Sequence, residues 1–242
     1  MSTPTDTPVE SLGEIQLFVP TDWFDLLEDG WDDEAARARI ADVVRRSYPQ
    51  HDPELRADFV QAMMLWRRTL LDQGVILDGL IAVPPEQTGD EHGATWQVMA
   101  GVVDLPTIDP DIDLGEVVLR LLGSRPDAST AYMESYPTEM GLGFGLLDRP
   151  VLLQDGSMSV PGSGVVPPED ESQVVAQIGL AVALACPPGG GRGLLVVGNC
   201  FDPSQLYGLG ALVAVIAGRS VFTGAAQPGE TAPARQSEND GR

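Results

Sequence analysis

Apolar residues in the first part of the chain recur at the spacing of an α-helix. After Asp32 and Asp33 the apolar positions are Ala36, Ile40 and Val43/Val44, which lie three or four residues apart. This spacing places them on one face of a helix that begins at Asp32 or Asp33. Upstream, "IQLFVP" (15–20) predicts a short strand.

A second, longer helix is predicted from Asp52 to about Gly74. Asp52 suits the N-cap, and Pro53 suits the first helical position, where its missing N–H would have no partner. Gly74 suits the left-handed residue that ends many helices. The expected buried face comprises Leu55, Phe59, Ala62/Met63, Trp66 and Leu70, and the expected exposed face comprises Arg56, Asp58, Arg67 and Arg68.

Strand patterns dominate after residue 74. They are "VILDGLIAVP" (75–84), "ATWQVMAGVVDLP" (94–106), "AYMESYP" (131–137), "GLGFGLLDRPVLL" (141–153), "QVVAQIGLAVALAC" (173–186) and "GLLVVGN" (193–199). Pro150 indicates an edge strand or a bend. The strand at 173–186 has one face of large residues and one of glycine and alanine. Since a small-residue face lets a helix approach closely, we expect both faces to be covered.

A capped helix closes the folded part. Asp202 suits its N-cap, with Pro203 and Gln205 behind it, and Gly218 its end. Its apolar stripe is Leu206, Leu209, Val213 and Ile216. The expected fold is α+β, a mostly antiparallel sheet with two N-terminal helices and a C-terminal helix packed on it. We expect one domain over 13–223, with disordered segments at 1–12 and 224–242.

Charge and composition limit the classes of partner and of chemistry that the chain can have. The 242 residues include 43% hydrophobic ones, enough for a core, and carry a net charge of −22. Such a surface disfavours nucleic acid and anionic membranes as partners. All 14 basic residues are arginine, which excludes lysine-based Schiff bases and P-loops.

Targeting signals are also absent from the sequence. No apolar stretch reaches the ~20 residues that span a bilayer. The start "MSTPTDTPVE" lacks the pattern of a signal peptide. We therefore expect a cytoplasmic protein without membrane insertion.

The stretch "CPPGGGRGLLVVGNC" (186–200) is read as a hairpin turn between two strands. Its glycines lead into a strand and are followed by no lysine, unlike a phosphate-binding loop. With a turn centred near Gly189 and Gly190, Cys186 faces Arg192 or Gly193. Cys200 is then ~20 Å away, beyond the ~7 Å Cα limit of a disulfide. We expect two free thiols and no metal pair.

Other chemistry-bearing residues are weaker candidates. The acidic stretch from Asp109 to Glu116 lacks the glycine and glutamate of an EF-hand, because Leu114 and Arg120 take those places. It is read as an acidic approach to a helix that Asp113 caps. The loop histidines, His51 and His92, have no partner at metal-ligand spacing. Glu134 and Glu139 would serve a carboxylate hydrolase only if they converged in one cleft.

The acidic aromatic segment, Asp22–Glu34, is the candidate partner-binding site. It holds seven acidic residues together with Trp23, Phe24 and Trp31. These aromatic side chains either pack onto the core or form a docking patch for a partner. The position of Trp23, directly after a strand, favours packing, whereas for Trp31 both readings stay open.

Several stretches together resemble a family of uncharacterised actinobacterial α/β proteins, some encoded near type VII secretion genes. They are "VPTDWFDL", the two-helix stretch "DEAARARIADVVRR…DPELRADFVQAMMLWRRTLLDQG", "VILDGLIAVP" and "FDPSQLYGLGALVAVIAGRSVF". The final hairpin and helix also look like those of Mog1/PsbP-like sandwiches. The resemblance spans roughly Ile15 to Phe222 and supplies no catalytic residue.

We therefore expect no enzyme and no cofactor, metal or catalytic residue. The expected function is that of an acidic binding or accessory protein acting through protein–protein contacts, with a secretion-associated role implied by the resemblance. Its partner would present a basic or mixed apolar surface. The alternative is a carrier of small apolar ligands, with a closed pocket between helices and sheet lined by residues such as Phe59, Trp66 and Leu180.

Overall fold

A computed structural model describes residues 15–20, 23–83, 93–105, 132–159, 171–188 and 191–223. Its helices are α1 (Asp33–Ser47), α2 (Pro53–Asp72) and α5 (Leu206–Arg219). Its strands are β1 (Ile15–Gln16), β2 (Phe24–Asp25), β3 (Val75–Val83), β4 (Ala94–Leu105), β5 (Tyr132–Thr138), β6 (Gly141–Asp148), β7 (Val151–Leu153), β8 (Val174–Gln177), β9 (Gly179–Cys186), β10 (Gly191–Cys200) and β11 (Val221–Phe222). Single 3₁₀ turns cover Glu171–Gln173 and Pro203–Gln205.

Some predictions lie outside the described residues. These are the acidic stretch 109–116, the helix expected at Asp113, His92, and the end segments 1–12 and 224–242. The strand expected over 15–20 is shorter than predicted, since only Ile15 and Gln16 pair, with β11.

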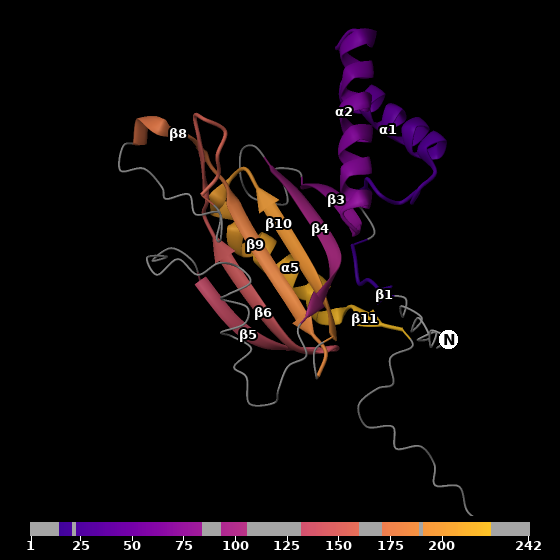
Figure 1. The fold of residues 1–242 in the computed structure, drawn as a ribbon. Helices are drawn as coiled ribbons and strands as arrows, with labels where there is room; N and C mark the ends of the chain where they lie inside the picture. The colour runs from indigo at the N-terminus through magenta and orange to yellow at the C-terminus, as the bar shows by residue number, and fades with distance from the viewer. Residues whose placement is uncertain are drawn as a thin grey trace, which may run out of the picture.

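The predicted α+β class is confirmed. Seven antiparallel strands form one sheet in the order β2-β3-β4-β10-β9-β6-β5 (Figure 1). Two further two-stranded sheets join β1 with β11 and β7 with β8. Strands β9 and β10 pair with Leu194 opposite Ala185, a register that centres their connection between residues 189 and 190, as predicted. Gly191, the first residue of β10, has a left-handed φ of 92°.

Helix α5 packs on the small-residue face of β9, as the alternation along that strand predicted. Its buried stripe is the predicted one, Leu206, Leu209, Val213 and Ile216. Gly198 on β10 shows how close the approach is, because a Cβ there would lie 2.7 Å from both Leu209 and Val213. The helix runs one residue past Gly218, to Arg219, and Ser220 caps it.

The single strand predicted over 173–186 is wrong, because it is divided at Ile178 into β8 and β9. β9 belongs to the large sheet, whereas β8 pairs with β7. The break at Ile178 lies opposite Pro150, the residue at which β6 and β7 are separated. The Ile178 N–H donates to the carbonyl of Pro150 at 3.0 Å, so the segments around Pro150 and Ile178 leave the large sheet side by side.

Helices α1 and α2 form a helical hairpin beside the β2–β3 edge of the sheet, away from α5 (Figure 1). Their predicted starts are confirmed: Asp32 caps α1 through the N–H groups of Glu34 and Ala35, and Asp52 caps α2 through Leu55. Gly74 has the left-handed φ, 76°, that its place after α2 requires. The hairpin has its own apolar cluster, which reaches the sheet at Val75 and Met99.

The predicted buried face of α2 is only partly right: Leu70 is buried, and Phe59 and Met63 are half-buried against the hairpin's cluster. The buried residues are Val60, Met64, Arg67 and Leu70, whereas Leu55 and Trp66 are exposed. Apolar residues occur on two sides of this helix, and α1 packs against only one of them. Arg67 lies on the packed side and is fully buried, because acceptors from the segment before α1 meet its guanidinium.

Candidate functional site

The acidic aromatic segment places its three aromatic residues in different environments. Trp23 is half-buried and packs against the main core. Its ring lies so close to β3 that a Cβ on Gly79 would be 2.6 Å from the Trp23 Cε3 atom. Any side chain at position 79 would clash with the Trp23 ring, and the packing of this ring on β3 holds the segment against the sheet.

Phe24 connects the segment to the helical hairpin. It forms β2 with Asp25 and pairs with Leu80 of β3. Its half-buried ring packs against the apolar cluster of the hairpin. The Arg39 guanidinium from α1 lies 4.6 Å from the ring centroid, within the range of a cation–π contact.

Trp31 points outward. Its side chain is 67% exposed, and it directly precedes Asp32, the N-cap of α1. Leaving so large an apolar side chain in water is unfavourable, which makes Trp31 the segment's best candidate for a contact residue.

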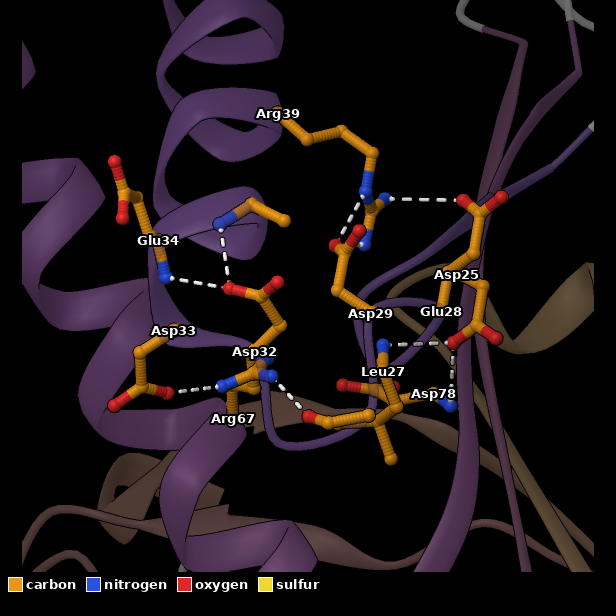
Figure 2. A network of polar contacts seen from close by, with 12 residues as sticks. Asp25, Leu27, Glu28, Asp29, Asp32, Asp33, Glu34, Arg39, Arg67 and Asp78 are labelled. Carbon is orange, nitrogen blue, oxygen red and sulfur yellow. Dashed lines mark hydrogen bonds and ion pairs between the residues drawn. The ribbon is translucent and has the colours of Figure 1, made fainter.

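Most of the acidic residues of the segment hold it in place (Figure 2). Arg39 pairs with Asp29 at 2.8 Å and with Glu28 at 3.5 Å. Asp25 accepts from the Leu27 N–H at 2.9 Å, and Asp32 caps α1. These carboxylates therefore have partners within the chain.

Arg67 ties the segment to α2 (Figure 2). Its Nη1 donates to Asp33 Oδ1 at 2.6 Å, and its Nη2 donates to the carbonyl of Gly30. The exposed Arg68 also donates to Asp33. Hydrogen bonds from the two guanidinium groups, that of Arg67 foremost, lower the pKa of Asp33.

A buried carboxylate lies beneath the hairpin. Asp78 of β3 is fully buried and accepts from Gln97 Nε2 at 2.9 Å and Trp66 Nε1 at 3.2 Å. Asp25 accepts from the Asp78 N–H at 3.3 Å. Burial raises the pKa of Asp78, and the neighbouring charge of Asp25 adds to this increase. Trp66 is exposed, but the hydrogen bond from its indole N–H to the buried Asp78 anchors its side chain.

A groove of about 530 Å³ runs along the hairpin, lined by Asp33, Arg37, Asp58, Gln61, Ala62, Met64, Leu65 and Arg68. Leu65 is 69% exposed, and Trp66 beside it in sequence is also exposed. Asp33 belongs both to this groove and to the segment that carries Trp31. The hairpin thus presents apolar side chains, acids and arginines on one structural unit.

A second hollow, the tyrosine cavity, lies between α5 and strands β5, β6 and β9, and has a volume of about 330 Å³. Its polar walls are Tyr132, Glu134, Tyr136 and Tyr207. Sequence reasoning missed it. The available signal was the alternation of Tyr132, Glu134 and Tyr136, which places all three side chains on one face of β5.

The other candidates do not form a site among the described residues. Glu134 lines the tyrosine cavity, whereas Glu139 follows the end of β5 and is not among the lining residues, so the two carboxylates share no cleft. The His51 ring stacks on Tyr48 with centroids 5.4 Å apart. Among the described side chains, no group of three His, Cys, Asp or Glu residues is placed to hold a metal ion.

Both cysteines are free, as predicted, and both are buried. Cys186 packs with Leu105, Phe144 and Leu184, and burial raises the pKa of its thiol to about 11. Cys200 belongs to the main core on the other face of the sheet.

Comparisons with known proteins add little. No protein-family model matches the chain, and no curated protein matches it. Among solved structures, the crystal structure of LpqN, involved in cell envelope biogenesis of Mycobacterium tuberculosis, is similar at 12% identity with a TM-score of 0.33. The match covers 90% of this chain and 87% of that one. A likeness this slight carries no argument about function.

Proposed function

We propose that this chain is a non-enzymatic binding or accessory protein that acts through protein–protein contacts made by the helical hairpin and the acidic aromatic segment. The observation that carries the proposal is Trp31. This large aromatic side chain is 67% exposed on a segment fixed on both sides by arginine pairs. A contact residue held on a rigid support loses little conformational entropy on binding.

The hairpin supports the same proposal. Leu65 and Trp66 on α2 add exposed apolar area to the unit that carries Trp31. Aromatic residues contribute disproportionately to binding energy at interfaces. The groove between α1 and α2 offers polar groups of both signs beside this apolar area.

The partner we propose bears a basic or mixed apolar surface. The chain carries a net charge of −22, which attracts a basic protein over long range and speeds association. Apolar contact with Trp31 would then supply affinity. We propose a cytoplasmic protein, and the resemblance to proteins encoded near type VII secretion genes makes a secretion component the first partner to test. No described helix is both long and apolar enough to cross a membrane.

The experiment is affinity capture from the native host, quantified by mass spectrometry, with Trp31→Ala beside the wild type. On the docking proposal, Trp31→Ala changes the free energy of unfolding by less than about 0.5 kcal/mol and depletes specific captured proteins. If the side chain instead packed on the core, the substitution would cost about 3–5 kcal/mol.

Phe201→Ala is the matched control. Phe201 is an exposed aromatic residue, 78% accessible, in the connection before α5. It should leave both stability and capture unchanged. Equal capture by the wild type and Trp31→Ala would contradict the proposal, as would equal depletion by both variants.

The alternative, a carrier of small apolar ligands, is less well supported. It called for a closed apolar pocket around Phe59, Trp66 and Leu180. Neither the groove along the hairpin nor the tyrosine cavity is lined by any of these residues. The tyrosine cavity has the size of a ligand site, but a carboxylate and three phenol groups line it.

A further inference from the structure

The tyrosine cavity owes its shape to small residues on both of its walls. On the sheet side, Glu134 of β5 pairs with Gly145 of β6, which in turn pairs with Ala183 of β9. Residue 145 has no side chain and residue 183 has one methyl group, so the sheet is hollow beside Glu134. On the helix side, Gly210, Ala211 and Ala214 line the cavity.

Three tyrosines line this hollow, of which Tyr132 and Tyr207 are exposed at its rim and Tyr136 is half-buried. Tyr132 and Tyr136 stand on β5 on either side of Glu134, and Tyr207 comes from α5. The Tyr136 ring lies over the backbone of β6, where a Cβ on Gly145 would be 3.5 Å from Tyr136 Cε1 and 3.8 Å from Glu134 Cγ. The ring and the carboxylate therefore border the same space.

The electrostatics of the lining favour a cation. Glu134 is the single charged residue among the lining residues that the structure describes. Tyr132 Oη donates to Glu134 Oε2 at 2.9 Å, which orients the carboxylate and leaves its other oxygen available. An anion would meet the carboxylate with no basic group to offset it.

Tyr136 adds an unused polar group. Its hydroxyl is buried and has no hydrogen-bond partner among the described atoms. Burial raises the pKa of Tyr136 to about 12, so the phenol stays neutral at physiological pH. A buried hydroxyl without a partner is unfavourable. Because solvent does not reach this hydroxyl, the ring of Tyr136 and not its hydroxyl faces the cavity.

We propose that the tyrosine cavity binds a small organic ammonium ion. Faces of tyrosine rings attract such cations, and an aromatic cage with one carboxylate is a general way of recognising them. Glu134 supplies the opposite charge, the three tyrosines supply the ring faces, and the Gly145–Ala183 hollow supplies the space. This site is separate from the helical hairpin and its docking role.

The test is an NMR titration of the full chain with choline, and with 3,3-dimethylbutan-1-ol, which has the same shape without the charge. Both are added at ~0.15 M salt, so that general attraction to the acidic surface is screened. We expect choline to shift resonances of the lining residues saturably, and the neutral alcohol to bind more than about tenfold more weakly.

Three variants locate the site. Glu134→Gln should weaken choline binding about fivefold, as expected for a part-exposed charge pair. Ala214→Leu should abolish binding by filling the cavity. Glu139→Gln changes a carboxylate in the connection between β5 and β6, outside the lining of the tyrosine cavity, and should bind choline like the wild type. Thermal unfolding of each variant shows that the fold is retained.

Three results would overturn the proposal. Equal affinity for choline and the neutral alcohol would show an apolar cavity rather than a cation site. Equal weakening by Glu134→Gln and Glu139→Gln would show attraction to the surface alone. Shifts that do not saturate, or that lie outside the lining residues, would show that the cavity does not bind ammonium ions.

Discussion

Arg67 shows how far one residue can depart from its expected environment. Charged groups are rarely buried unless they are paired, and Arg67 is buried with Asp33 and the Gly30 carbonyl as partners. Its removal takes the donor from the Gly30 carbonyl and from one Asp33 oxygen, and it removes one of the arginine attachments of the segment that carries Trp31. The residue therefore has more influence on the docking surface than its hidden position suggests.

We predict that Arg67→Met lowers the free energy of unfolding by about 2 kcal/mol, because the Gly30 carbonyl and one Asp33 oxygen both lose a charged donor. Arg68→Met is the matched control, because Arg68 also pairs with Asp33 but is exposed. It should cost less than about 1 kcal/mol. Urea unfolding measures both, and equal losses would contradict a special role for the buried arginine.

Asp78 gives a prediction about pH. Because its pKa in the folded protein is raised above 3.8, its ordinary value, the folded state resists ionisation. Its cost to stability is absent well below the ordinary pKa, grows as pH rises through the interval between the two values, and is then constant. Asp78→Asn removes this cost. The stability of Asp78→Asn relative to wild type should therefore rise as the pH is raised above the ordinary aspartate pKa of 3.8.

Asp33→Asn should show the opposite trend. The pKa of Asp33 is lowered by its arginine partners, so its contribution is present above 3.8 and is lost as pH falls. The variant should lose most relative to wild type near neutral pH and least in acid. Urea unfolding across the pH series measures both variants, and parallel pH curves for Asp78→Asn and wild type would contradict the assignment.

The thiols give a simpler test. With its pKa raised to about 11, Cys186 carries almost no thiolate at neutral pH, and both sulfurs are buried. We expect iodoacetamide to leave the native protein unmodified and to label two sites after denaturation. Intact mass spectrometry reads the result, and a mass lower by two hydrogens before reduction would reveal a disulfide.

At the scale of elements, the close approach of α5 to the sheet depends on Gly198. We predict that Gly198→Ala costs about 2 kcal/mol, because the new Cβ would lie 2.7 Å from Leu209 and Val213. Gly101→Ala on neighbouring β4 is the control, since its Cβ would meet no atom closer than 3.7 Å. Thermal unfolding compares them, and equal melting temperatures would contradict the tight packing.

The sequence predicts element starts better than it predicts faces and partners. Caps such as Asp32 and Asp52 act on their own neighbours, so a local pattern finds them. Asp202, predicted as the cap of the last helix, instead caps the 3₁₀ turn that precedes α5, and Gln205 stands at the N-cap of α5 without a side-chain bond. The packed face of α2 depends on where α1 docks, and the break at Ile178 depends on the distant Pro150. A local pattern reveals neither feature, because apolar residues occur on more than one side of α2 and also run through the break at Ile178.

The candidate sites likewise combine features that are local in the sequence with features that depend on distant segments. The sequence singles out Trp23, Phe24 and Trp31 together and favours packing for Trp23, but only the fold shows that Trp31 is exposed. The tyrosine cavity needs β5 and β6 from the middle of the chain and α5 from its end, so no short stretch contains it. Its one local trace is the alternation at Tyr132, Glu134 and Tyr136.

At the scale of the whole molecule, charge sets how binding responds to salt. With a net charge of −22, association with a basic partner should slow as salt rises, whereas apolar contact at Trp31 should change little. We predict an association rate constant that falls at least about tenfold from ~0.05 M to ~0.5 M salt, with a nearly constant dissociation rate. Surface plasmon resonance with the captured partner measures both, and a salt-independent association rate would contradict an electrostatic contribution.

The central claim is that the face carrying Trp31 docks a protein. Its most direct test is site-specific photo-crosslinking in the native host, with a benzophenone amino acid replacing Trp31 in one variant and Phe201 in another. Both side chains are exposed, so both probes sample the surroundings. We predict a discrete adduct with one protein of basic or mixed apolar surface at position 31 and none with that protein at position 201. The same adducts at both positions, or none at position 31, would contradict the claim.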